Sequence, residues 1–105
     1  MLKKVVLNVQ MPFADTANVV DKMPDEIKLS KRAETLIVGG VYEHYSGKKY
    51  NLIGVAHHSE DLSELVVYQA QYGNKLIWVR PLEMFLENVE IEGVTKPRFK
   101  YVGNN

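Results

Sequence analysis

Residues 64–80 read ELVVYQAQYGNKLIWVR, and their pattern is the clearest indication of the architecture. Two runs rich in β-branched and aromatic residues, 64–72 and 75–80, lie on either side of Gly73-Asn74. A glycine-containing dipeptide between two such runs is typical of a β-hairpin with a two-residue loop. Such a loop places Tyr72 opposite Lys75 and thereby determines which side chains share a face.

This register predicts one apolar face and one mixed face. The apolar face, which we expect to belong to the core, carries Tyr68, Ala70, Ile77 and Val79. The mixed face carries the only tryptophan of the chain, and its members are Val67, Gln69, Gln71, Leu76, Trp78 and Arg80. A register that differed by one residue would instead place Trp78 in the core.

Further short strands are expected on both sides of this hairpin. Upstream, residues 41–45 and 49–57 flank a turn at residues 46–48. Downstream, Pro81 begins a short helical turn, and a last hairpin occupies residues 87–101 around Gly93. A run of short strands separated by turn residues indicates a small barrel or sandwich.

In the last hairpin, a three-residue loop would pair acidic residues with basic ones. Glu92 would lie opposite Lys96, and Glu90 opposite Arg98. In this pairing, two of the acidic residues and two of the basic residues would neutralise one another on the surface.

The chain changes character near Gly39-Gly40. Before this pair, the pattern predicts a strand at residues 3–10, a helix capped by Asp15, a helix that starts at Pro24 and a strand at residues 35–38. We expect residues 1–38 to form an α/β arm that packs on the rest of the domain or on a dimer mate, because a lone strand leaves its backbone unpaired. The β domain is expected at residues 39–102, followed by a disordered tail at residues 103–105.

Composition excludes several classes of function. The chain has 105 residues, with 13 basic and 13 acidic side chains, three histidines and no cysteine. A zero net charge provides no general attraction to nucleic acid or to an anionic membrane. Without cysteine, disulfides, thiolate zinc sites, iron–sulfur clusters and thiol nucleophiles are excluded. Asn8 and Gln10 interrupt the first apolar run, so we expect no export signal and a cytoplasmic location.

Between residues 40 and 101 the sequence resembles the small bacterial family called "domain of unknown function 1653". The resemblance rests on an ordered series of motifs: GVYEHYSGKKY at 40–50, GVAHHSE at 54–60, ELVVY at 64–68, YG at 72–73, WVRP at 78–81, MF at 84–85 and PRF at 97–99. It implies an SH3-like β-barrel, and it implies no established activity, substrate or cofactor. The expected fold is therefore mainly β, a small SH3-like barrel with an N-terminal α/β extension.

The polar and aromatic residues of this region favour a non-catalytic binding module. An exposed tryptophan beside arginine and glutamine offers a rigid apolar plane with planar hydrogen-bond donors, which suits a small polar or anionic ligand or a protein segment. The expected binding residues are Trp78, Arg80, His44, Tyr45, His58, Glu60 and Gln69. We expect no catalytic residue, no metal and no cofactor, and a homodimer is left open.

Three alternatives compete with this interpretation. His44, His58 and Glu60 carry ligand types that suit zinc or iron, although their spacing is not diagnostic. An acid–base site could combine His44 or His58 with Glu60 or Glu83. An RNA-binding stripe could use three alternating basic residues near the end of the chain, namely Lys96, Arg98 and Lys100. In the expected register, Glu90 and Glu92 neutralise that stripe, and nucleic acid is therefore the weaker partner.

Overall fold

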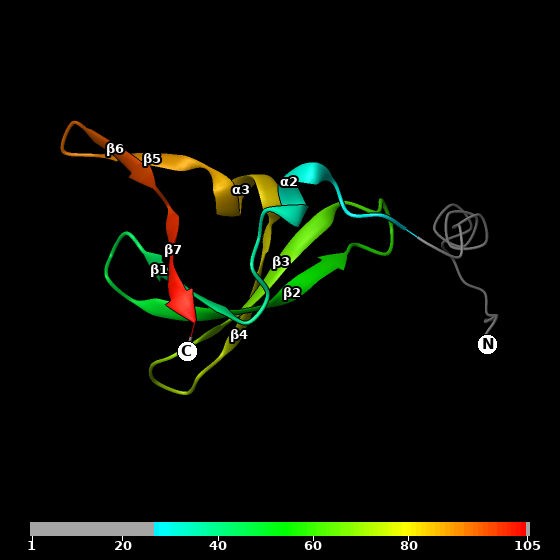
Figure 1. The fold of residues 1–105 in the computed structure, drawn as a ribbon, viewed down its shortest axis with the longest axis horizontal. Helices are drawn as coiled ribbons and strands as arrows, with labels where there is room; N and C mark the ends of the chain where they lie inside the picture. The colour runs from blue at the N-terminus through cyan, green and yellow to red at the C-terminus, as the bar shows by residue number, and fades with distance from the viewer. Residues whose placement is uncertain (1–26, 105) are drawn as a thin grey trace.

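The structure, a computed structural model, describes residues 27–104 of the chain (Figure 1). Its elements in chain order are α2 (Lys31–Glu34), β1 (Gly40–His44), β2 (Lys49–His57), β3 (Glu64–Ala70), β4 (Ile77–Pro81), α3 (Leu82–Leu86), β5 (Asn88–Ile91), β6 (Val94–Pro97) and β7 (Phe99–Asn104). The strand expected at residues 3–10 and the helices expected at Asp15 and Pro24 lie outside the described residues. No helix among the described residues is long and apolar enough to cross a membrane.

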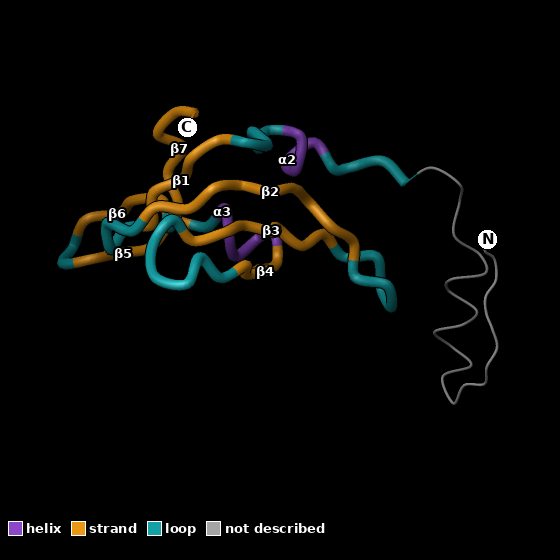
Figure 2. Tube along the Cα trace, turned by 90° about the horizontal axis from the view of Figure 1, so that it is seen from below, coloured by secondary structure: helices purple, strands orange, loops and turns teal. Residues whose placement is uncertain are grey.

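Five antiparallel strands form the main sheet, in the order β4-β3-β2-β1-β7, and β5 pairs with β6 in a separate hairpin. Figure 2 shows β1, β2 and β3 running side by side, with the β5–β6 hairpin and α2 towards opposite ends of the described domain. The fold is thus mainly β, as expected. Within the described residues, the hydrogen-bonded ladder ends at β4 and at β7 and does not close into a barrel.

The sheet is nevertheless strongly curled. In a flat sheet with strands about 4.8 Å apart, β3 and β7 would be separated by roughly 14 Å. Yet the ring of Tyr68 on β3 lies 5.3 Å from the ring of Phe99 on β7. Phe99 also stacks on Phe85 of α3, with ring centroids 4.2 Å apart. The curl therefore brings the two ends of the sheet towards one aromatic core.

That core is built from residues of the inner face of the sheet and from the two short helices. Its buried members are Ala33, Tyr42, Tyr50, Leu52, Val66, Tyr68, Ala70, Leu82, Phe85 and Phe99. Tyrosines can line this core because their hydroxyls find partners. The hydroxyl of Tyr42, for example, accepts the backbone N–H of Ile37 at 3.0 Å.

The strand expected at residues 49–57 is confirmed with the same bounds. Expected strand 41–45 is observed as Gly40–His44, and the turn at residues 46–48 follows it. These elements are predictable because a short turn pairs β1 directly with β2.

The expected register of the β3–β4 hairpin was wrong by one residue. Trp78 lies opposite Tyr68, and Ile77 lies opposite Gln69. The cause is Lys75, whose left-handed backbone (φ 57°) inserts one more residue into the turn, so that the backbone N–H of Ala70 bonds the carbonyl of Leu76. Trp78 therefore shares the inner face with Tyr68, whereas Ile77 and Val79 lie on the outer face.

The last hairpin also differs from the expectation. Glu92 and Gly93 both adopt positive φ, at 52° and 80°, and form a tight two-residue turn that pairs Glu90 with Thr95 and Val89 with Lys96. The expected pairs of Glu90 with Arg98 and Glu92 with Lys96 do not form.

Beyond Pro97, the chain leaves this hairpin and pairs with β1 as β7. Gly103 and Asn104 lie opposite Val41 and Gly40, so they belong to the sheet and not to a disordered tail.

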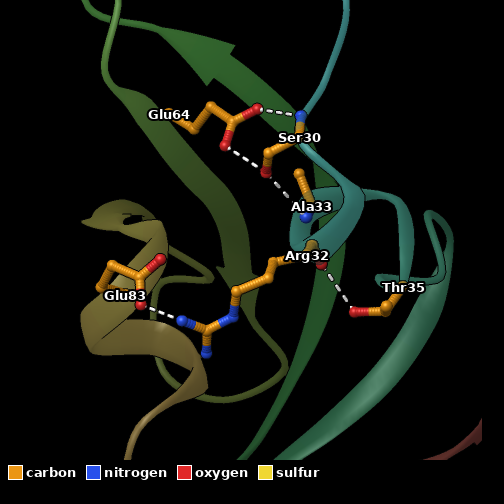
Figure 3. A network of polar contacts seen from close by, with 6 residues as sticks. All are labelled: Ser30, Arg32, Ala33, Thr35, Glu64 and Glu83. Carbon is orange, nitrogen blue, oxygen red and sulfur yellow. Dashed lines mark hydrogen bonds and ion pairs between the residues drawn. The ribbon is translucent and has the colours of Figure 1, made fainter.

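The strand expected at residues 35–38 is not formed, and the short helix α2 with a following turn is found instead. The reason is a local cap: the hydroxyl of Ser30 accepts the N–H of Ala33 at 3.1 Å, and Ala33 packs in the core. Glu64 holds this cap in place by accepting both the N–H and the hydroxyl of Ser30 at 2.7 Å (Figure 3). The described end of the expected arm is thus part of the domain core.

Candidate functional site

Three basic side chains converge at one end of the curled sheet, and we call them the cation cluster: His44, Arg80 and Arg98. Each is half-buried. The Cζ atom of Arg80 lies 5.8 Å from the centre of the Phe99 ring, and the His44 ring lies 5.0 Å from the same ring. The side chains of His44 and Arg80 therefore share the ring of Phe99 as an apolar base.

The fold explains why residues so distant in sequence meet here. His44 ends β1 and lies directly opposite Phe99 at the start of β7, and Arg98 immediately precedes Phe99. Arg80 is on β4, at the other edge of the sheet, where it lies opposite Val66. In a flat sheet β4 and β7 would be roughly 19 Å apart, so only the curl allows Arg80 to reach Phe99.

Hydrogen bonds orient the side chains of Arg80 and Arg98. The Nε of Arg80 donates to the hydroxyl of Tyr68 at 3.2 Å. The Nη2 of Arg98 donates to Glu87 Oε2 at 3.1 Å, and its Nε is buried with no hydrogen-bond partner within the described residues. Among those residues, Arg80 forms no ion pair, so the cluster carries more positive than negative charge.

The electrostatic effect of the cluster is visible at His44. Burial lowers the pKa of His44 below its usual value of 6.5, and the positive charges of Arg80 and Arg98 lower it further. The His44 Nδ1 also accepts the N–H of Ser46 at 3.1 Å, which leaves the proton of the neutral ring on Nε2. The site thus resists a third positive charge until an anion compensates it.

Tyrosines border the cluster. The hydroxyls of Tyr50 and Tyr72 are hydrogen-bonded at 2.8 Å, and Lys48 Nζ lies 4.4 Å from the centre of the Tyr72 ring. Burial, followed by the hydrogen bond to Tyr72, raises the pKa of Tyr50 to about 12. The Tyr45 ring lies 4.2 Å from the His44 ring and is exposed. The border therefore offers hydroxyl groups and aromatic faces, and Lys48 lies over one of these faces.

Of the binding residues expected from the sequence, the structure brings together His44, Tyr45 and Arg80. Trp78 is nearby, two residues before Arg80 on the same inner face, and it is 47% exposed. Gln69 lies on the outer face, where its Nε2 donates to the carbonyl of Lys75 at 3.0 Å.

His58 and Glu60 lie away from the cluster, at the opposite end of β2. The nine residues of β2 separate this end from the turn that follows His44, a length of roughly 26 Å. His58 Nδ1 accepts the N–H of Glu60 at 3.1 Å, and Asp61 accepts the N–H of Ser63 at 2.9 Å. The pKa of Asp61 is lowered, chiefly by that backbone N–H. The loop thus satisfies its own polar groups.

These positions bear on the metal and acid–base alternatives. A metal site made of His44, His58 and Glu60 does not assemble, because His44 is at the other end of the sheet. Glu83 forms an ion pair with Arg32 of α2, so it too is engaged elsewhere (Figure 3). No group of three or more metal-ligating side chains is present within the described part of the chain.

The basic stripe considered for RNA is divided by the fold. Lys96 lies on β6 and Lys100 on β7, while Arg98 lies between the two strands and turns inward to Glu87. The neutralisation by Glu90 and Glu92 that the sequence predicted does not occur, but the three basic residues do not share one continuous strand either.

Sequence reasoning missed Arg98, Tyr68 and Phe99 as parts of this site. Arg98 was considered for a surface pair with Glu90 and for the RNA-binding stripe, Tyr68 was expected in the core, and Phe99 was noted as part of a motif. One available signal was that Arg98-Phe99 and Arg80 both lie in the motif series. Their convergence depends on the curl of the sheet, which no local pattern encodes.

These features define the class of the protein. It is an antiparallel, mainly β domain with a cation cluster over an aromatic core. The sequence matches the family described as "Protein of unknown function (DUF1653)" over residues 40–101, and the chain belongs to that family. All three residues of the cation cluster lie within the matched region.

A crystal structure of a DUF1653 protein from Bordetella bronchiseptica is similar to this chain, with 32% sequence identity and a TM-score of 0.63. The similarity covers 70% of this chain and 95% of that one. No curated protein matches the sequence.

Proposed function

We propose that the domain is a non-catalytic binding module that holds a small anionic ligand, a carboxylate or a phosphate, at the cation cluster. The observation that carries the proposal is the convergence of His44, Arg80 and Arg98 around Phe99. Among the described residues, Glu87 is the one carboxylate that forms an ion pair with them. The SH3-like architecture remains part of the proposal, and the curl of the sheet supports it.

Arg80 provides the main attraction for such a ligand. A half-buried guanidinium without an ion-pair partner has lost part of its hydration without receiving an opposite charge, and an anion would supply that charge. Since Nε is engaged by Tyr68, the terminal nitrogens remain to donate in the planar fork that suits carboxylate and phosphate.

A non-catalytic role is supported by the surroundings of His44. Its Nδ1 contacts the hydroxyl and the N–H of Ser46, at 2.9 and 3.1 Å. General acid–base catalysis with a carboxylate as partner would require Glu60 or Glu83 beside this ring, and both are placed elsewhere. Trp78 and Tyr45 instead offer exposed rings that can contact the apolar part of a ligand or of a protein segment.

Titration calorimetry with inorganic phosphate and, separately, with succinate tests this function and distinguishes the two kinds of anion. We expect one of them to bind and Arg80→Gln to weaken that binding at least about tenfold, which corresponds to the loss of one charged hydrogen-bonding group. Arg80→Lys retains the charge but not the fork, so its affinity should fall between those of the wild type and Arg80→Gln.

Arg32→Gln is the matched control, because Arg32 pairs with Glu83 outside the cluster. It removes the same charge from the chain and should leave anion affinity unchanged. Equal losses in the two variants would indicate only non-specific charge attraction, and the absence of binding by both anions would contradict the proposal.

A further inference from the structure

Among the residues that the structure describes, the strand β4 is an edge of the main sheet. It pairs with β3, and no other described strand pairs with it. Four consecutive apolar residues at this edge are 47–60% exposed: Leu76, Ile77, Trp78 and Val79. Because side chains alternate between the faces of a strand, this run leaves apolar surface on both faces of the sheet.

Edge strands of soluble proteins usually carry features that prevent pairing with another chain. The opposite edge, β7, has such features: its ladder with β1 contains a register shift, it carries the charged Lys100, and Gly103 has a φ of 124°. On β4 the nearest charge is Arg80, which is turned to the inner face and to Tyr68. The edge of β4 is thus suited to accept a further strand.

The backbone groups that β4 offers can be identified from its pairing with β3. The N–H of Ala70 bonds the carbonyl of Leu76, so Leu76 points its backbone polar groups towards β3. In an antiparallel ladder this orientation alternates, and Trp78 and Arg80 also point inward. Ile77 and Val79 therefore direct their N–H and C=O groups outward. Pro81 has no N–H to offer, which limits the free edge to these two residues.

We propose that this edge pairs antiparallel with β4 of a second copy of the chain, with Trp78 opposite Trp78 of the second copy. In this register Ile77 of each copy lies opposite Val79 of the other, so both outward-facing residues form hydrogen-bonded pairs. The two tryptophans meet at the two-fold axis as a non-hydrogen-bonded pair, in which Cα atoms are only about 4.5 Å apart.

Other registers satisfy the edge less well. When a two-fold axis normal to the sheet relates the two copies, the inner faces of both copies lie on the same side. The pairing register of the two β4 strands can therefore change only in steps of two residues. Centring the pair on Ile77 would place Val79 opposite Lys75, which is in the left-handed turn. Centring it on Val79 would place Ile77 opposite Pro81, which cannot donate. Only the Trp78 register uses both free residues.

The charge of the chain supports a second copy as the occupant. Its formal net charge is zero, so two copies approach without long-range repulsion. In the Trp78 register Arg80 lies opposite Leu76, and no like charges oppose each other along the paired edge. The proposal does not rest on the proposed function, because its premise is the outer edge of β4 and not the cation cluster. Trp78 is the residue that the two proposals share.

Sedimentation equilibrium of the full chain over a range of concentrations, together with circular dichroism of the single tryptophan, tests the proposal. We expect a reversible dimer and an exciton couplet from the two adjacent indoles that disappears on dilution. Val79→Lys should weaken the dimer at least about tenfold, because it places a charge at each hydrogen-bonded pair. Val94→Lys is the matched control, since Val94 is 58% exposed on β6 and Val79 is 60% exposed, and it should dimerise like the wild type.

Amide hydrogen exchange adds a residue-specific measurement, and it does not depend on the folding of a variant. The N–H groups of Ile77 and Val79 should become protected as concentration rises, whereas that of Trp78 should be protected throughout by β3. A monomer at all concentrations would overturn the proposal, and so would a dimer unaffected by Val79→Lys. Protection of Ile77 and Val79 in the monomer would show that the edge is covered from within the chain, which also overturns it.

Discussion

The Nε of Arg80 donates a hydrogen bond to the hydroxyl of Tyr68, 3.2 Å away, and this bond links the cation cluster to the aromatic core. Tyr68 is 4% exposed and its ring packs on Phe85 and Phe99. The two residues can meet because β3 and β4 are adjacent and both side chains lie on the inner face. The bond fixes the direction of a guanidinium that has no ion-pair partner among the described residues.

Tyr68→Phe removes this bond and keeps the ring. We expect the phosphate or succinate affinity to fall about fivefold, since one hydrogen bond contributes about 1 kcal/mol and the free guanidinium must then be ordered by the ligand itself. Calorimetry measures the change, and thermal unfolding checks the fold. Tyr42→Phe, which removes another buried hydroxyl from the same core, should leave anion affinity as it is. An equal effect of both variants would mean that Tyr68 acts through stability alone.

Protonation of His44 should favour anion binding as the pH decreases. Burial and the charges of Arg80 and Arg98 lower the pKa of His44, so the ring is mostly neutral in the free protein at pH 6.5. A bound anion favours the protonated ring and therefore raises the pKa of His44, which by linkage couples proton uptake to binding. NMR titration of the His44 ring with and without phosphate measures this shift. His44→Gln retains only the pH dependence that comes from titration of the ligand, so the ratio of wild-type to variant affinity should increase as the pH falls. A pKa of His44 unmoved by the anion would contradict this coupling.

The same histidine makes the fold sensitive to acid. Because the folded pKa of His44 lies below the unfolded value of 6.5, the unfolded chain binds this proton more readily. The free energy of unfolding contributed by His44 therefore decreases as the pH falls below 6.5. Urea unfolding at several pH values should show a smaller decrease for His44→Gln than for the wild type, and identical profiles would exclude His44 as the cause.

The cap of α2 provides a separate contribution to stability. Ser30→Ala removes the acceptor for Ala33 and a donor to Glu64, and we expect it to lower the free energy of unfolding by about 1 kcal/mol. The side-chain hydroxyl and the backbone N–H of Ser30 lower the pKa of Glu64. The stabilisation that ionised Glu64 provides is therefore fully present above the pKa of the unfolded chain, 4.5. It is lost as the pH falls through the lower pKa of the folded protein.

Urea unfolding of Glu64→Gln should accordingly show a loss of stability at neutral pH that shrinks in acid. Glu90→Gln is the control, because Glu90 is an exposed strand residue opposite Thr95. A loss for Glu64→Gln that stayed constant with pH would disagree with the cap as its origin.

The parts of the fold that the sequence predicted are those set by local signals. The bounds of β2 follow from a turn before Lys49 and a polar loop after His57, and both are readable in the residues. The prediction of the β3–β4 register failed because Lys75 has a left-handed backbone conformation. This conformation is uncommon for residues other than glycine, so the residue type does not predict it. The β1–β7 pairing joins residues far apart in the chain, and turn chemistry alone carries no information on it.

The candidate site divides in the same way. His44, Tyr45 and Arg80 were recognised because arginine, histidine and aromatic residues gather in the motif region. Arg98 was not recognised because its position depends on β7 leaving the last hairpin to pair with β1. The strand at residues 3–10 and the helices before residue 27 stay predictions, since they lie outside the described residues.

The contribution of Trp78 to stability should be small for a residue of its size. Although it lies opposite Tyr68 on the inner face, it is at the edge of the sheet and 47% exposed, whereas Phe85 is 1% exposed at the centre of the core. We expect Trp78→Ala to cost about 1 kcal/mol, the value of an aromatic cross-strand pair. Phe85→Ala should cost about 3–5 kcal/mol, because it leaves a cavity. Thermal unfolding at low protein concentration, where any association is negligible, compares the two. If Trp78→Ala were as destabilising as Phe85→Ala, Trp78 would be a core residue, and it could not serve either the proposed ligand surface or the proposed contact between copies.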